Sequence, residues 1–162
     1  TAMMLYILVI SPLWPAFTEA YTKSDFGWMQ NTYKKMVRLY RWVALLIVAM
    51  VVCSPVVYRL WIGRVDVVPL SMSIMVGIYM LSSSWHNLQV YLINGIGKIK
   101  LQSYVTLLGL FLHIPLSLFL GKYIGALGVV TSMLAINLTY ATFFTIQINK
   151  IINQKATGIW NK

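Results

Sequence analysis

Acidic residues, cysteine and histidine are all scarce in this chain of 162 residues, and each shortage excludes a class of chemistry. The acidic residues Glu19, Asp25 and Asp66 lie at or beyond the ends of apolar segments, so no carboxylate pair is available for acid–base catalysis inside a membrane. For the same reason, no acid is predicted to carry a coupled proton or sodium ion. The single cysteine, Cys53, excludes a disulfide framework. The two histidines lack the HExxH spacing of a zinc enzyme, so we expect no enzyme, no metal site and no cofactor.

Charged residues of both signs are also rare, at 10% of the sequence, whereas hydrophobic residues make up 59%. A soluble globular domain usually carries about a quarter charged residues. With a mean hydropathy of +0.75, this chain lacks the polar surface to cover itself in water. Its net charge is +10, but the basic residues lie between apolar runs, which argues against a nucleic-acid partner. The sequence therefore predicts an integral membrane protein whose first partner is the lipid bilayer.

Long apolar segments are predicted to cross the membrane as helices. A span needs about 20 mostly apolar residues, and unbroken apolar runs argue against a β-barrel. The predicted spans are 2–17, 37–62, 67–93, 101–120 and 124–148. The first is short and lacks the features of a signal peptide, so we expect a C-terminal piece of a longer protein. Glycine-rich turns separate the later spans at 94–97 and 121–125. The predicted fold is an all-α, polytopic transmembrane bundle of about five helices.

The basic residues predict the orientation of these spans. Of the 13 Lys and Arg residues, Arg59, Arg64 and Lys122 fall on one side of the predicted bundle and the remaining ten fall on the other. Basic residues near the ends of spans accumulate on the cytoplasmic side. We therefore expect a multi-pass protein whose C-terminus is cytoplasmic.

The segment 24–36, between the first two spans, is predicted to be an amphipathic helix that lies in the headgroup layer before the chain turns into the second span. Large apolar side chains recur there at steps of three and four, and basic residues form a separate stripe. The predicted headgroup contacts are Lys34, Lys35, Arg38 and Arg41. Two interpretations remain open: a general anchor for anionic lipid, or contact with a phosphorylated substrate.

Polar residues recur along one face of each of the last three predicted spans. Small and weakly polar residues are also common where membrane helices pack, so any single residue fits either packing or a cavity. Three such faces together favour a shared polar cavity. His113 is the first candidate because it lies mid-span, two residues before the helix-distorting Pro115. The full set of predicted cavity residues is His113, Asn87, His86, Ser84, Tyr91, Thr106, Asn137 and Tyr140.

Three stretches of the sequence carry a resemblance to a known family. They are 12–21 (PLWPAFTEAY), 92–102 (LINGIGKIKLQ) and 114–125 (IPLSLFLGKYIG). In order and spacing these stretches resemble the polysaccharide-export branch of the multidrug, oligosaccharidyl-lipid and polysaccharide exporter superfamily, and the resemblance covers nearly the whole chain. Members of this branch are flippases for lipid-linked oligosaccharides such as O-antigen repeat units.

The resemblance implies a two-lobed bundle of about twelve to fourteen helices, whose central cavity opens alternately to each side of the bacterial inner membrane. This chain would form most of the second lobe. The implied substrate is a pyrophosphate-linked oligosaccharide lipid, and the implied partners are the N-terminal lobe, a polysaccharide polymerase and glycosyltransferases. Family members meet the pyrophosphate with cationic residues. No Lys or Arg lies mid-span here, so that part would fall to the other lobe, or to His113, Arg41 and their neighbours.

Two other functions fit a polytopic membrane protein with polar faces. A multidrug or toxin extruder of the same superfamily would share the fold, but we would expect membrane carboxylates for ion coupling. A membrane-embedded transferase acting on lipid-linked sugars should show acids or histidines clustered at one membrane face. A purely structural membrane subunit would need no polar faces at all.

Overall fold

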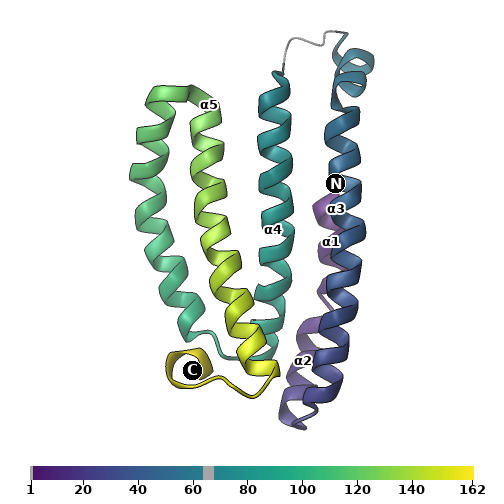
Figure 1. Ribbon diagram of the computed structural model, residues 1–162, viewed down its shortest axis with the longest axis vertical. Coiled ribbons are helices and arrows are strands. Elements are labelled where there is room, and N and C mark those ends of the chain that lie inside the picture. The colour runs from purple at the N-terminus through teal and green to yellow at the C-terminus, as the bar shows by residue number, and fades with distance from the viewer. Residues whose placement is uncertain (1, 64–67) are drawn as a thin grey trace.

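The computed structural model describes residues 2–63 and 68–162, and all of the regular structure in these residues is helical. The long helices stand side by side, and the chain reverses direction between them (Figure 1). Their bounds are α1 Ala2–Ile10, α2 Leu13–Thr22, α3 Phe26–Ile62, α4 Leu70–Ile96 and α5 Lys100–Ile152, followed by the short 3₁₀ helix η1 Gly158–Asn161. The predicted all-α class is therefore confirmed for the described residues.

The first predicted span, 2–17, consists of two helices. α1 ends at Ile10 and α2 begins at Leu13, and Pro12 lies in the break between them. Proline has no backbone N–H and its ring crowds the preceding turn, so it interrupts the helical hydrogen-bond ladder. The Trp14 N–H donates to the Ser11 carbonyl at 3.2 Å, which closes a turn between the two helices. Taken together, Met3–Thr22 is still long and apolar enough to cross a membrane.

α3 differs from the prediction because it does not bend between an interfacial segment and a span. It begins where the Asp25 side chain accepts a hydrogen bond from the Trp28 N–H at 2.9 Å, and it ends at Gly63, which has a φ of 75°. Its 37 residues form one continuous helix. No glycine or proline occurs from 28 to 54, so nothing interrupts the backbone hydrogen bonds where the turn near residue 36 was expected.

α5 is a helical hairpin rather than one straight helix. Ile124 and Gly125 have non-helical backbone angles, and the φ of 60° at Gly125 is one that favours glycine. The chain reverses there, so that 100–123 and 126–152 run antiparallel (Figure 1). The reversal falls inside the glycine-rich turn predicted at 121–125. Gly128 allows the two halves to approach closely, because any Cβ at this position would collide with the Leu120 carbonyl.

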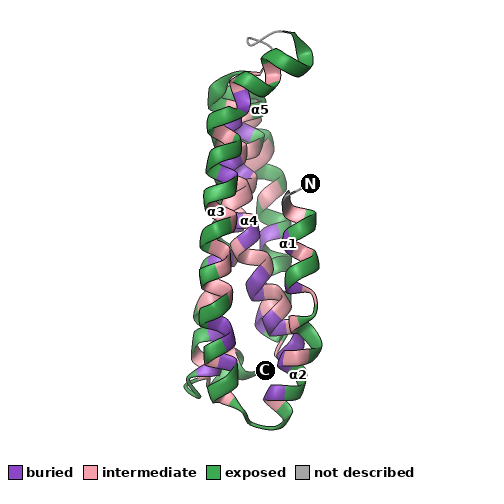
Figure 2. Cartoon of the chain, turned by 90° about the vertical axis from the view of Figure 1, so that its right-hand side faces the viewer, coloured by how far each residue is buried: buried purple, intermediate pink, exposed green. Residues whose placement is uncertain are grey.

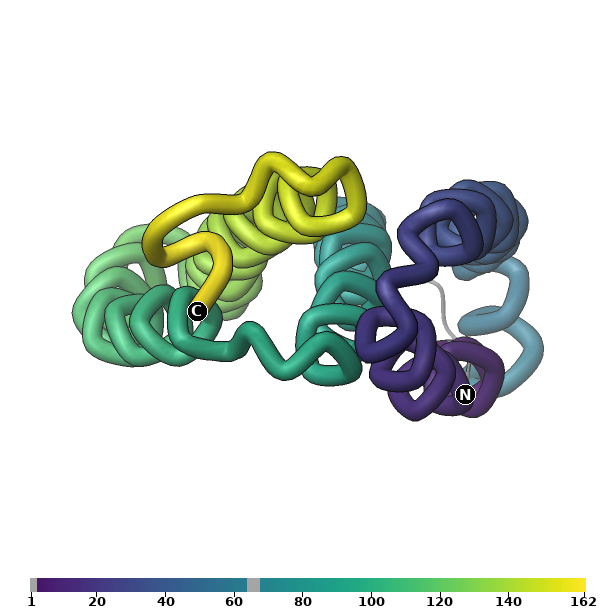
Figure 3. The backbone as a smooth tube through the Cα atoms, turned by 90° about the horizontal axis from the view of Figure 1, so that it is seen from below, coloured from purple at the N-terminus to yellow at the C-terminus, as the bar shows by residue number. Residues whose placement is uncertain are grey.

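α4 occupies the middle of the bundle, with α1, α2 and α3 on one side and α5 on the other (Figures 1 and 3). Burial is greatest along α4 and on the faces turned toward it, whereas the outer face of α3 is exposed (Figure 2). α2 lies close against the end of α4 because Gly95 has no side chain. The Thr18 hydroxyl donates to the Gly95 carbonyl at 2.7 Å.

Among the described residues, three helical segments are long and apolar enough to cross a membrane: Met3–Thr22, Phe26–Ile62 and Lys100–Ile152. These segments support a membrane-embedded bundle. α4 is not one of them, although its 27 residues are long enough, because its middle is rich in Ser, His, Asn and Gln. The predicted third span therefore rests on the length of α4 rather than its composition, and its predicted start at Val67 lies outside the described residues.

Exposed aromatic residues mark two levels along the bundle. On α3, Trp42 and Trp61 are 68% and 85% exposed, and they are separated by about 28 Å of helix. On the first half of α5, Tyr104 and Tyr123 are also exposed and have the same spacing. Trp and Tyr concentrate at both membrane interfaces, and the hydrocarbon between the interfaces is about 30 Å thick. The aromatic spacing therefore fits one bilayer.

Substitution Gly95→Ala is expected to lower the stability of the intact protein by about 1–3 kcal/mol, the usual cost of overpacking. Its methyl group would lie 2.6 Å from the Trp14 carbonyl oxygen, so α2 would have to move. The control Gly27→Ala adds the same methyl group, but there the nearest neighbouring atom is an Asp25 side-chain oxygen at 3.7 Å. Thermal unfolding in detergent, followed by circular dichroism, measures both variants. Equal melting midpoints for the two would contradict the close α2–α4 contact.

Candidate functional site

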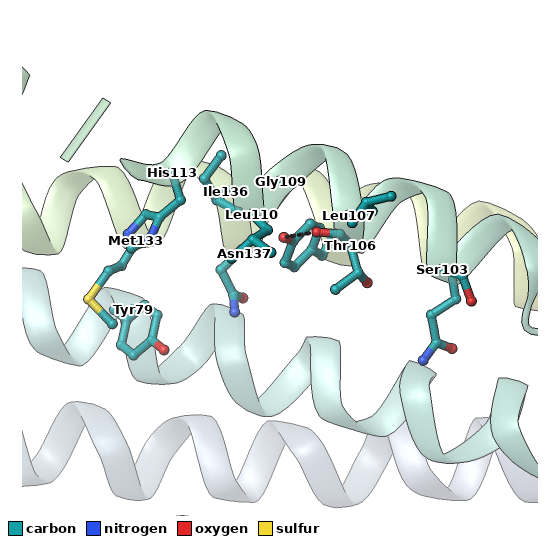
Figure 4. Close-up of a pocket in the computed structure, with 12 residues that line it drawn as sticks. Tyr79, Ser103, Thr106, Leu107, Gly109, Leu110, His113, Met133, Ile136 and Asn137 are labelled. Carbon is teal, nitrogen blue, oxygen red and sulfur yellow. Dashed lines mark hydrogen bonds between the residues drawn. The ribbon is translucent and has the colours of Figure 1, made fainter. Parts of the chain in front are cut away.

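A groove of about 570 Å³ lies between α4 and the two halves of α5 (Figure 4). α4 contributes one residue, and the two halves of the α5 hairpin contribute the others from facing sides. We call it the α4–α5 groove and define it by Tyr79, Gln102, Ser103, Thr106, Leu107, Gly109, Leu110, His113, Met133, Ile136, Asn137 and Tyr140.

The first half of α5 presents its polar face to this groove. The predicted residues Thr106 and His113 fall at helical spacing on one face together with Gln102, and all three line the groove. Asn137 and Tyr140 approach from the second half of the hairpin. The structure therefore brings together four of the eight predicted cavity residues, namely His113, Thr106, Asn137 and Tyr140.

Asn137 is held in place from α4. The buried Ser82 hydroxyl donates to the Asn137 Oδ1 at 2.9 Å, and this hydrogen bond orients the carboxamide at the wall of the groove. A hydrogen bond between two buried side chains is costly to break, because each partner would be left without a replacement. The bond therefore couples the register of α4 to that of the second half of α5.

Tyr140 crosses from the second half of α5 to the first. Its hydroxyl donates to the Thr106 carbonyl at 3.2 Å. This position requires a glycine opposite, because any Cβ at Gly109 would collide with the Tyr140 hydroxyl and ring. Gly109 and Tyr140 together set how closely the two halves approach at the groove.

Two polar atoms at the groove have no hydrogen-bond partner among the described residues. They are Nε2 of His113 and Oε1 of Gln102, and both atoms are buried. A buried polar atom without a partner costs about 1–3 kcal/mol, so such atoms commonly mark a place where water or a ligand supplies the missing bond. Both side chains lie on the same wall of the groove. This pair is the strongest indication that the groove receives a polar ligand.

The other four predicted cavity residues, Ser84, His86, Asn87 and Tyr91, lie outside the lining of this groove. Ser84 donates to the Met80 carbonyl at 2.8 Å, and Asn87 donates to the Ser83 carbonyl at 2.9 Å. Tyr91 packs edge-on against Trp14 of α2, with ring centroids 6.2 Å apart. Ser84, Asn87 and Tyr91 fall on one face of α4, as their spacing predicts. Ser84 contacts Met3 of α1 and Tyr91 contacts Trp14 of α2, so this face meets α1 and α2 rather than α5.

His86 belongs to the opposite face of α4, next to the groove. Its ring lies against Tyr140 and Phe144, with centroids at 5.5 and 5.4 Å. Tyr79 and Ser82 precede it at steps of three and four, and this set is the face of α4 that meets α5. Tyr79 was not among the predicted cavity residues. Its spacing of seven residues, two helical turns, from His86 places it on the same face of α4 and would have identified it.

Three of the four predicted headgroup contacts lie together, and the fourth lies apart from them. Lys34, Arg38 and Arg41 line a second crevice of about 460 Å³ between α3 and the end of α5, whereas Lys35 does not line it. In the part of the chain that the structure describes, no three His, Cys, Asp or Glu residues are placed to hold a metal ion. The lining of the α4–α5 groove contains no Asp, Glu, Lys or Arg.

No protein-family model, curated protein or solved structure matches the chain. The function is therefore inferred from the chemistry of the α4–α5 groove and from the arrangement of the helices around it. The groove has a largely apolar lining without Asp, Glu, Lys or Arg, and a buried amide oxygen and a buried imidazole nitrogen at its wall have no hydrogen-bond partner among the described residues. It offers no carboxylate for acid–base catalysis.

Gly109→Ala is expected to destabilise the intact protein by about 1–3 kcal/mol, because the new methyl group would displace Tyr140. In a Tyr140→Ala background the same substitution should cost much less, since the colliding ring is gone. Gly121→Ala is the matched control on the same helix, where the nearest atom of Val129 is 3.4 Å away. A double-mutant cycle of unfolding measures the coupling. A cost of Gly109→Ala that is independent of residue 140 would contradict the contact across the groove.

Proposed function

We propose that this chain belongs to a transporter that moves lipid-linked oligosaccharide units across the bacterial inner membrane, and that the α4–α5 groove is one wall of the path. The observation that carries the proposal is the pair of unpartnered buried atoms, His113 Nε2 and Gln102 Oε1, in a neutral groove between apolar helices. Sugar hydroxyl groups both donate and accept hydrogen bonds, so they supply partners to both atoms.

The shape and lining of the groove favour part of a sugar chain over an ion. Its volume of about 570 Å³ lies within the range of small-molecule sites. Asn137 supplies a carboxamide oriented by Ser82, and the Tyr79 and Tyr140 rings supply flat apolar surfaces. A binding surface without a carboxylate pair suits a substrate that is carried unchanged, which favours transport over a transferase.

The segment after α5 supports closure of the groove at one end. It folds back beneath the two halves of α5 (Figure 3), and the buried Gln147 amide donates to the Lys98 carbonyl at 2.8 Å and to the Trp160 carbonyl at 3.4 Å. Trp160 also lies under the Lys150 ammonium group, at 4.2 Å from the ring centroid. In an alternating-access cycle, this end would be the cytoplasmic one and would open when these contacts separate.

The multidrug extruder remains the second candidate because its fold would be the same. The described groove lining has no carboxylate that would couple export to an ion. The two functions predict different phenotypes: loss of surface glycan for the flippase, and sensitivity to toxic compounds for the extruder.

Asn137→Leu in the intact protein is expected to lower glycan export about five- to tenfold, the effect of losing about one hydrogen bond to the substrate. Asn87→Leu is the matched control, because its carboxamide bonds within α4 and does not line the groove. Surface glycan and protein abundance in the membrane are measured together. If the two variants export equally at equal abundance, or if only drug resistance falls, the flippase proposal is wrong.

The proposed orientation makes a separate prediction. With Cys53 changed to Ser, a cysteine placed at Lys122, beside the α5 turn, should react with a membrane-impermeant maleimide added outside intact inner-membrane spheroplasts. A cysteine placed at Lys155 should react only after the membrane is opened. The reverse pattern would place the C-terminus outside and overturn the orientation.

A further inference from the structure

The crevice between α3 and the end of α5 combines three cations with uncharged donors from a second helix. Lys34, Arg38 and Arg41 fall on one face of α3, at steps of four and three, and Asn149 and Asn153 face them from the last turn of α5. We call this space the basic crevice and define it by these five residues together with Gln30, Tyr33, Val37 and Ile152. Its volume is about 460 Å³.

None of the residues lining the basic crevice is acidic. The two acids in the described part of the chain are used elsewhere: Glu19 pairs with Lys23 at 2.6 Å, and Asp25 caps the start of α3. Like charges one turn apart on a helix repel one another. The crevice is therefore a concave site whose positive charge is left without a counter-ion by the residues around it.

The carboxamides of Asn149 and Asn153 add hydrogen-bond donors to the positive charge of the crevice. Asn149 Nδ2 donates to the Thr145 carbonyl and Asn153 Nδ2 donates to the Asn149 carbonyl, each at 2.8 Å, so each amide keeps a second N–H for a ligand. The α3 and α5 walls are already joined at one edge, where Gln30 Nε2 donates to the Ile152 carbonyl at 2.9 Å. An oxyanion with several acceptor oxygens would bridge the two walls across the rest of the crevice.

The level of the crevice along α3 matches the lipid headgroups. Arg41 immediately precedes Trp42, which belongs to one of the two exposed aromatic levels. Lys34 lies about 10 Å farther from the hydrocarbon along the helix. The headgroup layer on each side of a bilayer occupies a zone of about this order.

The same stripe of α3 continues into the hydrocarbon as exposed apolar side chains. After Arg41, the steps of four and three reach Leu45, Val48 and Val52, which are 59%, 49% and 71% exposed. Three cations followed by an apolar track match the order of a phospholipid, with its phosphate above its acyl chain. A free phosphate has no acyl chain and would leave these apolar side chains without a contact.

We propose that the basic crevice binds the phosphate of one anionic phospholipid, whose acyl chain lies along this track of α3. The bound lipid would join the N-terminal half of α3 to the end of α5, two elements that otherwise meet over a small area. Lys35, adjacent in sequence but outside the crevice, takes no part. The site is independent of the substrate that the α4–α5 groove carries.

The test is titration of short-chain phosphatidylglycerol into the intact, delipidated protein in neutral detergent, with the melting midpoint and native mass spectrometry as readouts. Saturable one-to-one binding and a rise in the midpoint are expected, and phosphatidylcholine should give neither. Combined Arg38→Gln and Arg41→Gln should weaken binding at least about tenfold, and Asn149→Ala about fivefold. Lys35→Gln removes one charge outside the crevice and should leave the affinity unchanged.

Three results would overturn the proposal. Equal weakening by Lys35→Gln and by Arg38→Gln alone would show a diffuse electrostatic effect, because both remove one charge from neighbouring positions. Binding unaffected by Asn149→Ala would remove α5 from the site. Displacement of the lipid by millimolar inorganic phosphate, or by a polyprenyl pyrophosphate at much lower concentration, would assign the crevice to a soluble anion or to a transported substrate instead.

Discussion

The bundle is organised around one constraint: α4 carries too many polar groups to face hydrocarbon. Each unsatisfied polar group in lipid costs several kcal/mol, so these side chains need hydrogen-bond partners inside the protein. Ser84 and Asn87 find them on carbonyls of α4 itself, and others find them on the neighbouring helices. Trp85 Nε1 donates to the Thr145 hydroxyl of α5 at 2.8 Å, Ser82 bonds Asn137, and the Tyr40 hydroxyl of α3 donates to the Leu81 carbonyl at 3.0 Å. The apolar helices are thereby held around α4.

The groove follows from this arrangement. The α5 hairpin bonds α4 through Asn137 and Thr145, while Tyr140 crosses between its two halves over Gly109 and donates to the Thr106 carbonyl. On the first half of α5, neither α4 nor the second half supplies a hydrogen-bond partner to the buried Gln102 Oε1 and His113 Nε2 among the described residues. The unpaired atoms are thus a consequence of the hairpin geometry.

The sequence predicted the helical class, the α5 turn and the polar face of its first half, because all three depend on local composition and periodicity. It did not predict which neighbouring helices the polar residues of α4 would contact. Periodicity places Ser84, Asn87 and Tyr91 on one face, but it does not say which neighbouring helix that face meets. The basic crevice could not be predicted from the sequence for a related reason. Arg38 and Asn149 are far apart in the chain, and only the packing of α3 beside α5 brings them together.

The two sites differ in charge because they lie at different depths. An isolated cation in the groove would be costly to bury, and the groove lining contains no Lys or Arg. The cations of the basic crevice lie at the aromatic level, where water and headgroups stabilise them. If a lipid pyrophosphate crosses beside the groove, this chain can therefore hydrogen-bond the sugar at mid-depth but does not neutralise the phosphate there through Lys or Arg. Under the proposed transport function, the countercharge for the crossing would have to come from another surface that faces the groove.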